Sequence, residues 1–526
     1  MNTILNSKFF VIFFAPFLLG ALTVLCFSPY NITIINFLSF SGLLFFIYTI
    51  KKKTASNYRK KKSNRYFFYL GCSFGFGFFL FGNYWISISL THEESFKNLI
   101  PFALILIPLF LSLFFGFSTL IVGAFSDKKI HFILLFSLVF SLFEFLRSNL
   151  LTGFPWNLIS YTWSQSSETI QILSILGTYS LSLISVTFFC TPFIFFQKKL
   201  IKKNLVFLLI LLVIFIANFI YGSYKINKDK YTFDKNISIK IVSPSFSLED
   251  YNNKSESSQI ERLIKISDPK KNKKTIFIWP EGVFYESYLQ DIKQYKKLFE
   301  SNFSDNHLII LGINNFIHKN DNDIENKNYF NSLVILNNKL EILSIYNKIN
   351  LVPFGEFLPF EKTLSKYGLK KITRGYNSFS KGDERKVINL GDKFDNKLIL
   401  PLICYEIIYT GKIKTKNQTP NLIVNISEDA WFGQSIGPHQ HFAKAIYRAL
   451  EEGVYIARSA NKGISAFVDP NGKVIKSLNT GESGSIELDF PYFNKSTIFS
   501  NYGNKIFYLF ILLYIFLTLI LKKYEI

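Results

Sequence analysis

Few residues in this chain could cross-link it or bind a transition metal. The 526 residues include only four cysteines and six histidines. Three of the cysteines lie in long hydrophobic runs, so Cys404 is the only thiol in the polar part of the sequence and has no disulfide partner there. His439 and His441 form an isolated His-x-His pair, which is a weak signal for a metal site. We therefore expect no metal, although either histidine could instead be a partner for Cys404.

The glycine-rich motifs of nucleotide-binding proteins are also missing. The sequence contains neither a Gly-x-x-x-x-Gly-Lys phosphate loop nor a dinucleotide fingerprint, so no cofactor is expected. Acidic residues are few, since 37 Asp and Glu against 59 Lys and Arg give a net charge of +22. Such an excess can indicate nucleic acid or an anionic membrane. Here the positive charge accompanies a lysine and asparagine bias along the chain and flanks the hydrophobic runs, so we expect a lipid bilayer as partner and no nucleic acid.

Long hydrophobic runs, by contrast, are abundant. Hydrophobic residues make up 49% of the chain, while the mean hydropathy is only +0.22, as expected when membrane spans are combined with a polar domain. A helix needs about 20 mostly apolar residues to cross a ~30 Å hydrocarbon core. Eight such spans are predicted at residues 9–27, 32–50, 66–86, 99–125, 132–146, 170–196, 205–221 and 506–521. The first run has no clear small-residue cleavage site and is followed at once by another, so we interpret it as a retained span.

The loops on the two sides of these spans differ in positive charge. The loops after the second, fourth and sixth spans hold 14 Lys and Arg, eight of them in residues 51–65, whereas the loops after the first, third and fifth hold only Lys97 and Arg147. Lys and Arg are kept on the cytoplasmic side of a membrane. This bias predicts cytoplasmic N- and C-termini, with the segment between the seventh and eighth spans on the opposite face.

That segment, residues 225–495, is predicted to be a layered α/β domain, because short apolar runs alternate in it with charged segments. Strands are predicted at 237–242, 275–279, 307–313, 332–336, 397–403 and 421–426, with a hairpin at 466–475. Helices are predicted at 257–266, 288–299 and 441–453, and the polar tract 318–328 is expected to be a loop. The expected domains are therefore 1–224, 225–495 and 496–526.

Polar residues of complementary kinds follow the apolar strands of this domain. Glu281 follows one strand, Lys348 and Glu356 lie together in a second segment, and Cys404 ends a third strand. Nucleophilic catalysis by a thiol needs a base, a positive charge or N–H donors for the oxyanion, and burial to tune both. Glutamate, lysine and cysteine supply one of each. Each residue alone has an ordinary structural explanation, because charged side chains usually lie exposed and a buried strand cysteine is usually inert.

The order Glu281, Lys348, Cys404, each after an apolar strand, resembles the nitrilase superfamily. Within it, four longer segments resemble the apolipoprotein N-acyltransferase family: FLRSNLLTGFPW (145–156), NKINLVPFGEFLP (347–359), ICYE (403–406) and DAWFGQSIGPHQHF (429–442). The likeness covers nearly the whole chain, including the eight-span layout. It implies a multi-span α-helical membrane domain together with a nitrilase-like four-layer αββα sandwich.

The resemblance also implies a reaction. It is a two-step ping-pong acyl transfer from a phospholipid, through a thioester on the cysteine, to the α-amine of a diacylated apolipoprotein. The enzyme would lie in a bacterial inner membrane with its catalytic domain in the periplasm. The matching catalytic residues are Glu281, Lys348 and Cys404, supported by Glu356, Tyr405 and Glu406. Candidate acyl or lid contacts are Phe354, Phe357, Trp431, Phe432 and Tyr251.

The sequence departs from the family pattern in three places. Glu428 stands where the family has asparagine before Asp-Ala-Trp-Phe, and residues 243–245 (Ser-Pro-Ser) replace the usual Gln-Gly-Asn. A tryptophan expected on a lid loop near residues 248–252 is absent, and Tyr251 is the nearest aromatic residue. These differences concern the expected substrate lid rather than the three catalytic positions.

Other readings of the sequence remain open. A membrane-tethered carbon-nitrogen hydrolase, an amidase or nitrilase, would use the same three residues with water resolving the acyl-enzyme. A transporter or receptor would use the outer domain to bind ligand, although the spans hold few charges that could form a permeation path, with Glu144 and Arg147 near the end of one.

Overall fold

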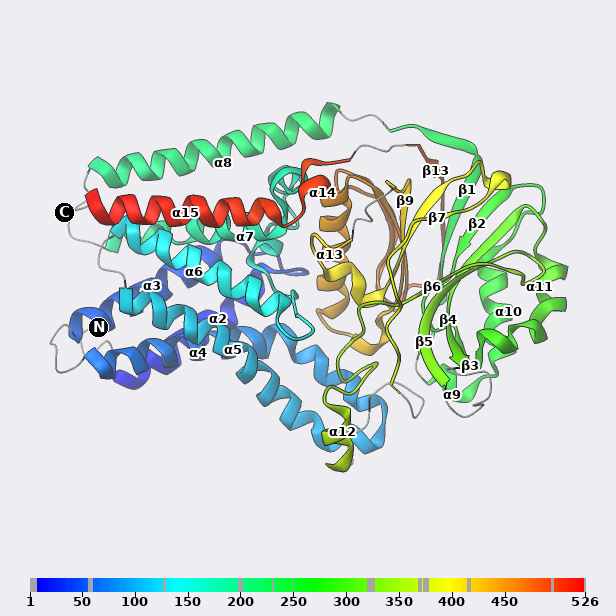
Figure 1. Ribbon diagram of the computed structural model, residues 1–526, viewed down its shortest axis with the longest axis horizontal. Helices are drawn as coiled ribbons and strands as arrows, with labels where there is room; N and C mark the ends of the chain where they lie inside the picture. The colour runs from blue at the N-terminus through cyan, green and yellow to red at the C-terminus, as the bar shows by residue number, and fades with distance from the viewer. Residues whose placement is uncertain are drawn as a thin grey trace. The chain divides into compact units, whose positions relative to one another are not determined.

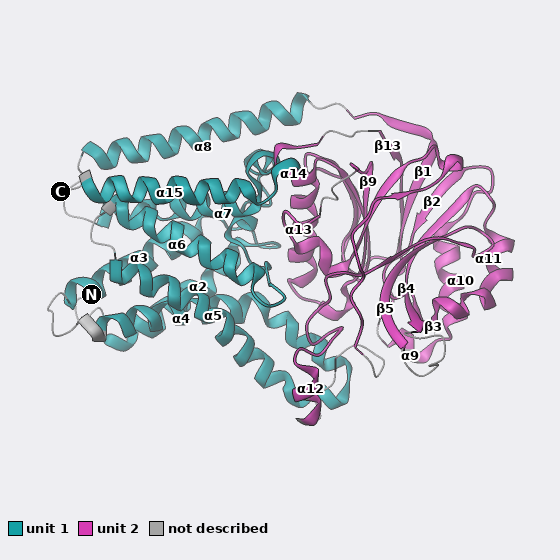
Figure 2. Ribbon diagram, viewed as in Figure 1, with its two compact units in different colours: residues 1–228, 501–526 teal, residues 229–500 magenta. Residues whose placement is uncertain are grey.

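The chain folds into two compact units (Figure 2). Unit 1 joins Met1–Lys228 to Asn501–Ile526, and unit 2 is Asp229–Ser500. The computed structural model describes residues 7–54, 60–125, 129–196, 202–228, 231–247, 249–318, 327–367, 371, 378–413, 418–492 and 496–524. The polar middle of the sequence thus forms a unit of its own, and both ends of the chain belong to the other unit.

Unit 1 is built from helices (Figure 1). Its α-helices are α2 (Ala15–Thr23), α3 (Ile35–Lys53), α4 (Lys60–Asn83), α5 (Ile100–Phe125), α6 (Lys129–Asn149), α7 (Leu173–Phe189), α8 (Lys202–Lys228) and α15 (Lys505–Tyr524). Five described segments are long and apolar enough to cross a membrane: Glu94–Phe125, Ile130–Asn149, Thr169–Phe196, Lys202–Lys228 and Lys505–Lys523. Phe10–Cys26 is a shorter apolar helix. Several apolar helices are therefore confirmed, while the count of eight spans stays a prediction.

Small residues let α4 approach its neighbours closely. A Cβ on Gly71 would lie 2.4 Å from the backbone oxygen of Phe115 in α5, and a Cβ on Gly77 would lie 2.2 Å from the backbone oxygen of Phe17 in α2. The hydroxyl of Thr119 in α5 donates to the backbone oxygen of Phe67 in α4 at 2.8 Å. Close contact between small residues is the usual way in which helices associate inside a bilayer, where the hydrophobic effect does not hold them together.

Unit 2 contains two sheets. The first has seven strands in the order β13-β1-β2-β4-β5-β6, with β3 paired to β4, and the second has six in the order β12-β11-β10-β9-β8-β7. The strands of the first are β1 (Phe233–Ser243), β2 (Lys274–Ile278), β3 (Phe284–Tyr288), β4 (His307–His318), β5 (Lys327–Leu336), β6 (Ile342–Asn347) and β13 (Gly484–Pro491). Those of the second are β7 (Ile388–Asn389), β8 (Leu398–Ile403), β9 (Leu422–Glu428), β10 (Tyr455–Asn461), β11 (Ser465–Val468) and β12 (Val474–Leu478).

Parallel strands form the centre of each sheet. β1, β2 and β4 run parallel in the first sheet, and β8, β9 and β10 run parallel in the second. The carboxyl ends of parallel strands lie at one edge of a sheet, which is where ligands bind in open α/β folds. Polar residues that follow β2, β8 and β9 are therefore gathered at sheet edges.

Alternate residues along the strands fill two separate cores. Ile276 and Ile278 of β2 belong to a cluster that also contains Val424 of β9, so this cluster lies between the two sheets. Phe277 of β2 and Trp279 belong to a second cluster on the other face of the first sheet. The second cluster contains residues of α10 (Glu256–Ser267) and α11 (Lys296–Asn302), and Figure 1 shows both helices beside that sheet. Because side chains alternate across a strand, near-continuous apolar runs are needed where both faces are covered.

Further short helices complete unit 2. α9 (Asp250–Asn253) precedes α10, α12 (Glu361–Leu364) follows the segment after β6, and α13 (Gly437–Glu452) follows β9, while α14 (Ile498–Tyr502) spans the sequence boundary between the two units after Ser500. Figure 1 shows α13 beside the second sheet. Two 3₁₀ turns, η12 (Cys404–Ile408) and η13 (Asp429–Phe432), follow β8 and β9 directly. The chain therefore turns sharply at the carboxyl ends of both strands.

Most elements predicted from apolar runs are confirmed. The six predicted strands correspond to β1, β2, β4, β5, β8 and β9, and the predicted hairpin corresponds to β11 and β12. The helix predicted over 288–299 is wrong in part, because Leu289–Tyr295 is a 3₁₀ segment and only Lys296–Asn302 is α-helical. The polar tract 318–328 is not all loop: its ends belong to β4 and β5, and residues 319–326 lie outside the described residues.

Strand β4 offers a matched test of the core between the sheets. Ile310 is fully buried in that core, whereas Ile317 on the same strand is 52% exposed. Ile310→Ala should cost about 2–5 kcal/mol of folding free energy, because a cavity remains between the sheets. Ile317→Ala should change it by no more than about 0.5 kcal/mol. Thermal unfolding of the full-length protein in detergent measures both, and equal midpoints for the two variants would contradict this account of the core.

Candidate functional site

Glu281 lies just beyond β2, where its carboxylate is buried and accepts three hydrogen bonds. Oε1 accepts from Lys348 Nζ at 3.3 Å and from Asn331 Nδ2 at 2.6 Å. Oε2 accepts from the backbone N–H of Glu428 at 3.0 Å. Gly312 on β4 makes room for this residue, since a Cβ there would lie 2.6 Å from the Cα of Glu281. The position of Glu281 therefore depends on a close backbone approach that only glycine allows.

Lys348 follows β6 and is enclosed by two carboxylates. Its Nζ donates to Glu356 Oε1 at 2.9 Å and to Glu281 Oε1 at 3.3 Å, and its side chain is 1% exposed. Burial by itself would lower the pKa of Lys348, but the negative charges of Glu281 and Glu356 hold it well above its usual value. The ammonium group is therefore a permanent, well-oriented positive charge.

Asn331 joins the two carboxylates, and the sequence did not predict this role. Its Nδ2 donates to Glu281 Oε1 at 2.6 Å and to Glu356 Oε1 at 2.7 Å. Its backbone oxygen accepts from the N–H of Lys348 at 2.9 Å. The second oxygen of Glu356 accepts from the N–H of Val352 at 2.8 Å, which closes the loop after β6 around the lysine. The signal available in the sequence was a polar residue directly before the predicted strand 332–336.

Cys404 directly follows β8 and has a left-handed backbone, since its φ is +47°. Burial raises the pKa of its thiol well above the usual value, the Glu281 carboxylate raises it further, and the Lys348 ammonium lowers it. The side chain of Ser427 on β9 also lowers the pKa of the thiol. The structure thus brings Glu281, Lys348 and Glu356 into direct contact, with Cys404 close enough to interact electrostatically with the first two.

Glu406 ties the segment that contains Lys348 to the strand that ends at Cys404. Its Oε1 accepts from the backbone N–H groups of Ile349 and Asn350 at 2.9 and 3.2 Å, and Oε2 accepts from the N–H of Ile403 at 2.9 Å. Arg385 Nη2 donates to the same carboxylate at 3.1 Å.

The adjacent Tyr405 is buried and packs edge to face on Tyr409 with ring centroids 5.5 Å apart. Two residues that donate hydrogen bonds to Glu406, Arg385 and Tyr346 through its hydroxyl, were not predicted from the sequence.

Two departures from the family pattern, Glu428 and Tyr251, contact each other. The hydroxyl of Tyr251 in α9 donates to Glu428 Oε2 at 3.0 Å, and Asn461 Nδ2 donates to both oxygens of the same carboxyl group at 2.9 and 3.0 Å. Burial raises the pKa of Glu428 to about 8, and the nearby charge of Glu281 contributes to the shift. The expected lid residue Tyr251 is therefore buried and held next to the strand end that binds Glu281.

The other aromatic candidates lie in two loops. Phe354, 50% exposed and with a φ of +61°, and the partly buried Phe357 lie in the loop that follows Lys348. Trp431 and Phe432 are partly buried in η13 after β9. The Phe432 ring packs edge to face on His441 with centroids 5.6 Å apart.

The histidines occupy different environments. His441 is fully buried in α13, and its Nε2 lies 3.3 Å from the backbone oxygen of Cys404, not at the sulfur. His439, two residues earlier, is partly buried. The structure therefore places His441 behind the thiol's backbone, where it does not form a Cys-His pair of the kind that activates a nucleophile.

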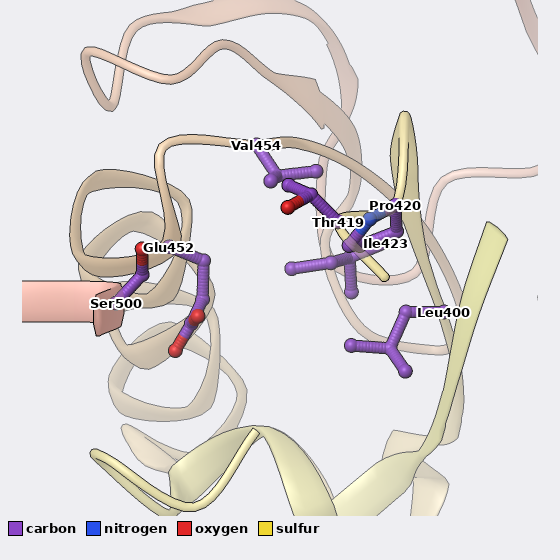
Figure 3. A pocket seen from close by; sticks show the side chains of 7 residues that line it. All are labelled: Leu400, Thr419, Pro420, Ile423, Glu452, Val454 and Ser500. Atoms are coloured by element: carbon purple, nitrogen blue, oxygen red, sulfur yellow. The ribbon is translucent and has the colours of Figure 1, made fainter. Parts of the chain in front are cut away.

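A small pocket lies elsewhere in unit 2 (Figure 3). In the figure, the polar side chains of Glu452 and Ser500 face Ile423 and Pro420 across it. The full lining is Leu400, Thr419, Pro420, Ile423, Glu452, Val454 and Ser500. Because none of these residues belongs to the cluster around Lys348, the pocket is not the reacting site.

The charge arrangement predicts how the thiol titrates. Glu281→Gln removes a negative charge that disfavours the thiolate, so the pKa of Cys404 should fall and alkylation by iodoacetamide should begin at a lower pH than in the unaltered protein. Mass spectrometry of the peptide that contains Cys404 measures the rate against pH. Glu261→Gln on the exposed face of α10 is the control and should leave the profile unchanged. An unchanged or upward-shifted profile for Glu281→Gln would contradict the described electrostatics.

Comparisons with known proteins agree with this architecture. Residues 19–191 match the family model for the apolipoprotein N-acyltransferase N-terminal domain, and residues 260–491 match that for carbon-nitrogen hydrolase. Among solved structures, an amidase from Neterenkonia sp. AN1 is 14% identical, with a TM-score of 0.31, over 49% of this chain and 92% of the amidase. At that score the structural likeness alone supports no argument.

Three curated relatives, each named apolipoprotein N-acyltransferase, match most of the chain. The Rickettsia prowazekii protein is 35% identical over 82% of this chain and 85% of the relative, and the Rickettsia bellii protein is 36% identical over 85% and 88%. The Brucella melitensis protein is 28% identical over 91% and 89%. Identity of this level over nearly the full length of both chains shows that this protein belongs to the apolipoprotein N-acyltransferase family of membrane enzymes.

Proposed function

We propose that this enzyme transfers a fatty acyl chain from a phospholipid, through a thioester on Cys404, to the α-amine of the diacylglyceryl-cysteine of an apolipoprotein. The observation that carries the proposal is the buried contact of Glu281 and Lys348 at the strand ends, with the only thiol of the polar unit within their electrostatic reach. A base, a fixed cation and a thiol are the groups that thioester formation requires.

In the first step Glu281 accepts the proton of the Cys404 thiol, and the resulting thiolate attacks the ester carbonyl of the phospholipid. The ammonium group of Lys348 and the backbone N–H after the nucleophile stabilise the oxyanion. The C–O bond of the ester then breaks. Glu281 returns the proton to the leaving alkoxide, which departs as a lysophospholipid and leaves the acyl group on sulfur.

In the second step the neutral α-amine of the apolipoprotein attacks the thioester carbonyl. Lys348 again stabilises the oxyanion, the C–S bond breaks, and the Cys404 sulfur leaves with a proton that Glu281 takes from the amine. The products are an amide and a free thiol. Glu356 supports both steps by holding Lys348 at 2.9 Å, and Glu406 supports them by joining the two backbone segments that carry Lys348 and Cys404.

The same proposal includes the membrane setting. It assigns residues 1–224 to a seven-span domain, 225–495 to a periplasmic catalytic domain with the αββα sandwich, and 496–526 to the last span in a bacterial inner membrane. The excess of Lys and Arg in alternate loops supports cytoplasmic termini.

The exposed Phe354, with Phe357, Trp431 and Phe432, is proposed to contact acyl chains, because these aromatic side chains lie in loops that follow Lys348 and β9. Tyr251 is the proposed lid residue.

The thioester gives a direct test. The purified protein, incubated with phospholipid alone, should gain the mass of one fatty acyl group on Cys404, and the group should transfer when a diacylated lipopeptide is added. Cys404→Ser and Cys404→Ala should gain no thioester and transfer nothing. Acyl transfer by either variant would refute the nucleophile. Release of free fatty acid with no transfer would favour the carbon-nitrogen hydrolase alternative, in which water resolves the acyl-enzyme.

Gly312 offers a second test that leaves the reacting residues unchanged. The Cβ of Gly312→Ala would lie 2.6 Å from the Cα of Glu281, so the base must move. A displacement of about 1 Å can lower a rate by roughly 10²-fold, and we expect a loss of acyl transfer of that order. Gly484→Ala in β13 is the control, since its Cβ would meet only Leu478 at an ordinary 3.5 Å. Equal transfer rates for the two variants would contradict the proposed role of Glu281.

A further inference from the structure

The backbone of Cys404 is held in a conformation that a cysteine rarely adopts. Its φ of +47° lies in the left-handed region, whereas Ile403 before it is extended, with a φ of −105°. A non-glycine residue persists there only when its surroundings impose the conformation. The contacts behind the sulfur are therefore of interest, because they determine where the thiol points.

One such contact comes from His441 of α13. Its Nε2 lies 3.3 Å from the backbone oxygen of Cys404, and its Nδ1 lies 3.1 Å from Asp429 Oδ1. Arg458 of β10 completes the cluster, because its Nη2 lies 2.8 Å from Asp429 Oδ2 and 3.1 Å from His441 Nδ1. Asp429, His441 and Arg458 are all fully buried. Three consecutive elements, η13, α13 and β10, thus meet behind the nucleophile.

The donors and acceptors in this cluster indicate which ring nitrogen carries the proton. Burial and the Arg458 charge lower the pKa of His441 to about 4, so the ring is neutral near pH 7 and has one N–H. The Cys404 carbonyl can only accept, and Arg458 can only donate. A proton on Nε2 satisfies both contacts, with Nδ1 accepting from Arg458. A proton on Nδ1 would satisfy Asp429 alone, so the geometry favours the Nε2–H tautomer.

Asp429 lies at the centre of the same cluster. The hydroxyl of Ser427 donates to Asp429 Oδ1 at 2.6 Å. Arg458 balances the charge: although burial raises the pKa of Asp429, Arg458 holds it well below its usual value. Asp429 therefore holds Arg458 in place, and Arg458 in turn contacts His441 Nδ1.

We propose that His441, oriented by Arg458, which Asp429 holds in place, is a positioning residue that donates a hydrogen bond to the Cys404 carbonyl and holds the nucleophile in its left-handed conformation. The proposal rests on the function proposed above, because it assigns His441 a role in forming the thioester on Cys404. His441 neither accepts the thiol proton nor touches the substrate. It acts through the backbone, so its loss should change how often the sulfur points at the ester carbonyl.

Substitutions of His441 by side chains of different length distinguish a hydrogen bond to the Cys404 carbonyl from simple packing. The amide of His441→Gln extends to the former position of Nε2 and can donate to the Cys404 carbonyl, whereas the shorter amide of His441→Asn reaches only toward Asp429. In single-turnover acylation by phospholipid, measured as the mass gain on Cys404, His441→Ala and His441→Asn should lose about tenfold or more in maximal rate. His441→Gln should stay within about threefold of the unaltered enzyme. The phospholipid concentration at half-maximal rate should not change in any variant.

His439→Ala, two residues away on the same helix, is the matched control and should acylate normally. Thermal midpoints establish that each variant is folded, and if His441→Ala does not fold, the comparison of Gln with Asn decides. Acylation of His441→Ala at the unaltered rate, or of His441→Asn as fast as His441→Gln, would overturn the proposal. Failure of the proposed function is distinguishable, because the unaltered enzyme would then gain no acyl group while its Cys404 still reacts with iodoacetamide.

Discussion

The buried positive charge of Lys348 is the constraint on which the rest of the site depends. An ammonium group that has lost its water is costly unless carboxylates replace the water, and removing one partner of such a cluster leaves an uncompensated charge. Here Glu281 and Glu356 both lie within 3.3 Å of the lysine nitrogen. They come from different segments of unit 2, after β2 and in the loop after β6, so the charges are balanced only when the first sheet is fully assembled.

Two other carboxylates extend this principle to the second sheet. Glu406 gathers backbone N–H groups from the segment after Lys348 and from the end of β8, and Asp429 gathers Arg458 and Ser427 behind Cys404. In each case a buried anion is satisfied by donors from several elements, as buried polar groups must be. The apolar core between the sheets brings the strand ends together, and these anions then determine which way the side chains and backbone at those ends point.

Several elements were predictable because their signal is local. β2, β4, β5, β8 and β9 are short apolar runs bounded by polar residues, and a strand covered on both faces is expected to have that form. β10, with the sequence YIARSAN, was missed because its buried residues include Arg458 and Asn461, whose partners come from other strands and helices. The polar end of β4 at His318 was missed for a related reason, since it is paired to Lys327 of β5 across residues that look like a loop in the sequence.

The sequence by itself determined the division into apolar helices and a polar α/β unit. It also determined the order of Glu281, Lys348 and Cys404 and their places after apolar strands. Both are readable because hydrophobic periodicity and residue type are properties of short segments. Only the tertiary structure decided which donors hold these residues: Asn331 between two carboxylates, Glu406 across two loops, and His441 on the carbonyl of Cys404. The physical reason is that a hydrogen bond between segments tens or hundreds of residues apart leaves no periodic signal in either segment. Such a bond forms only after strand pairing and core packing have brought its donor and acceptor atoms to within about 3 Å of each other.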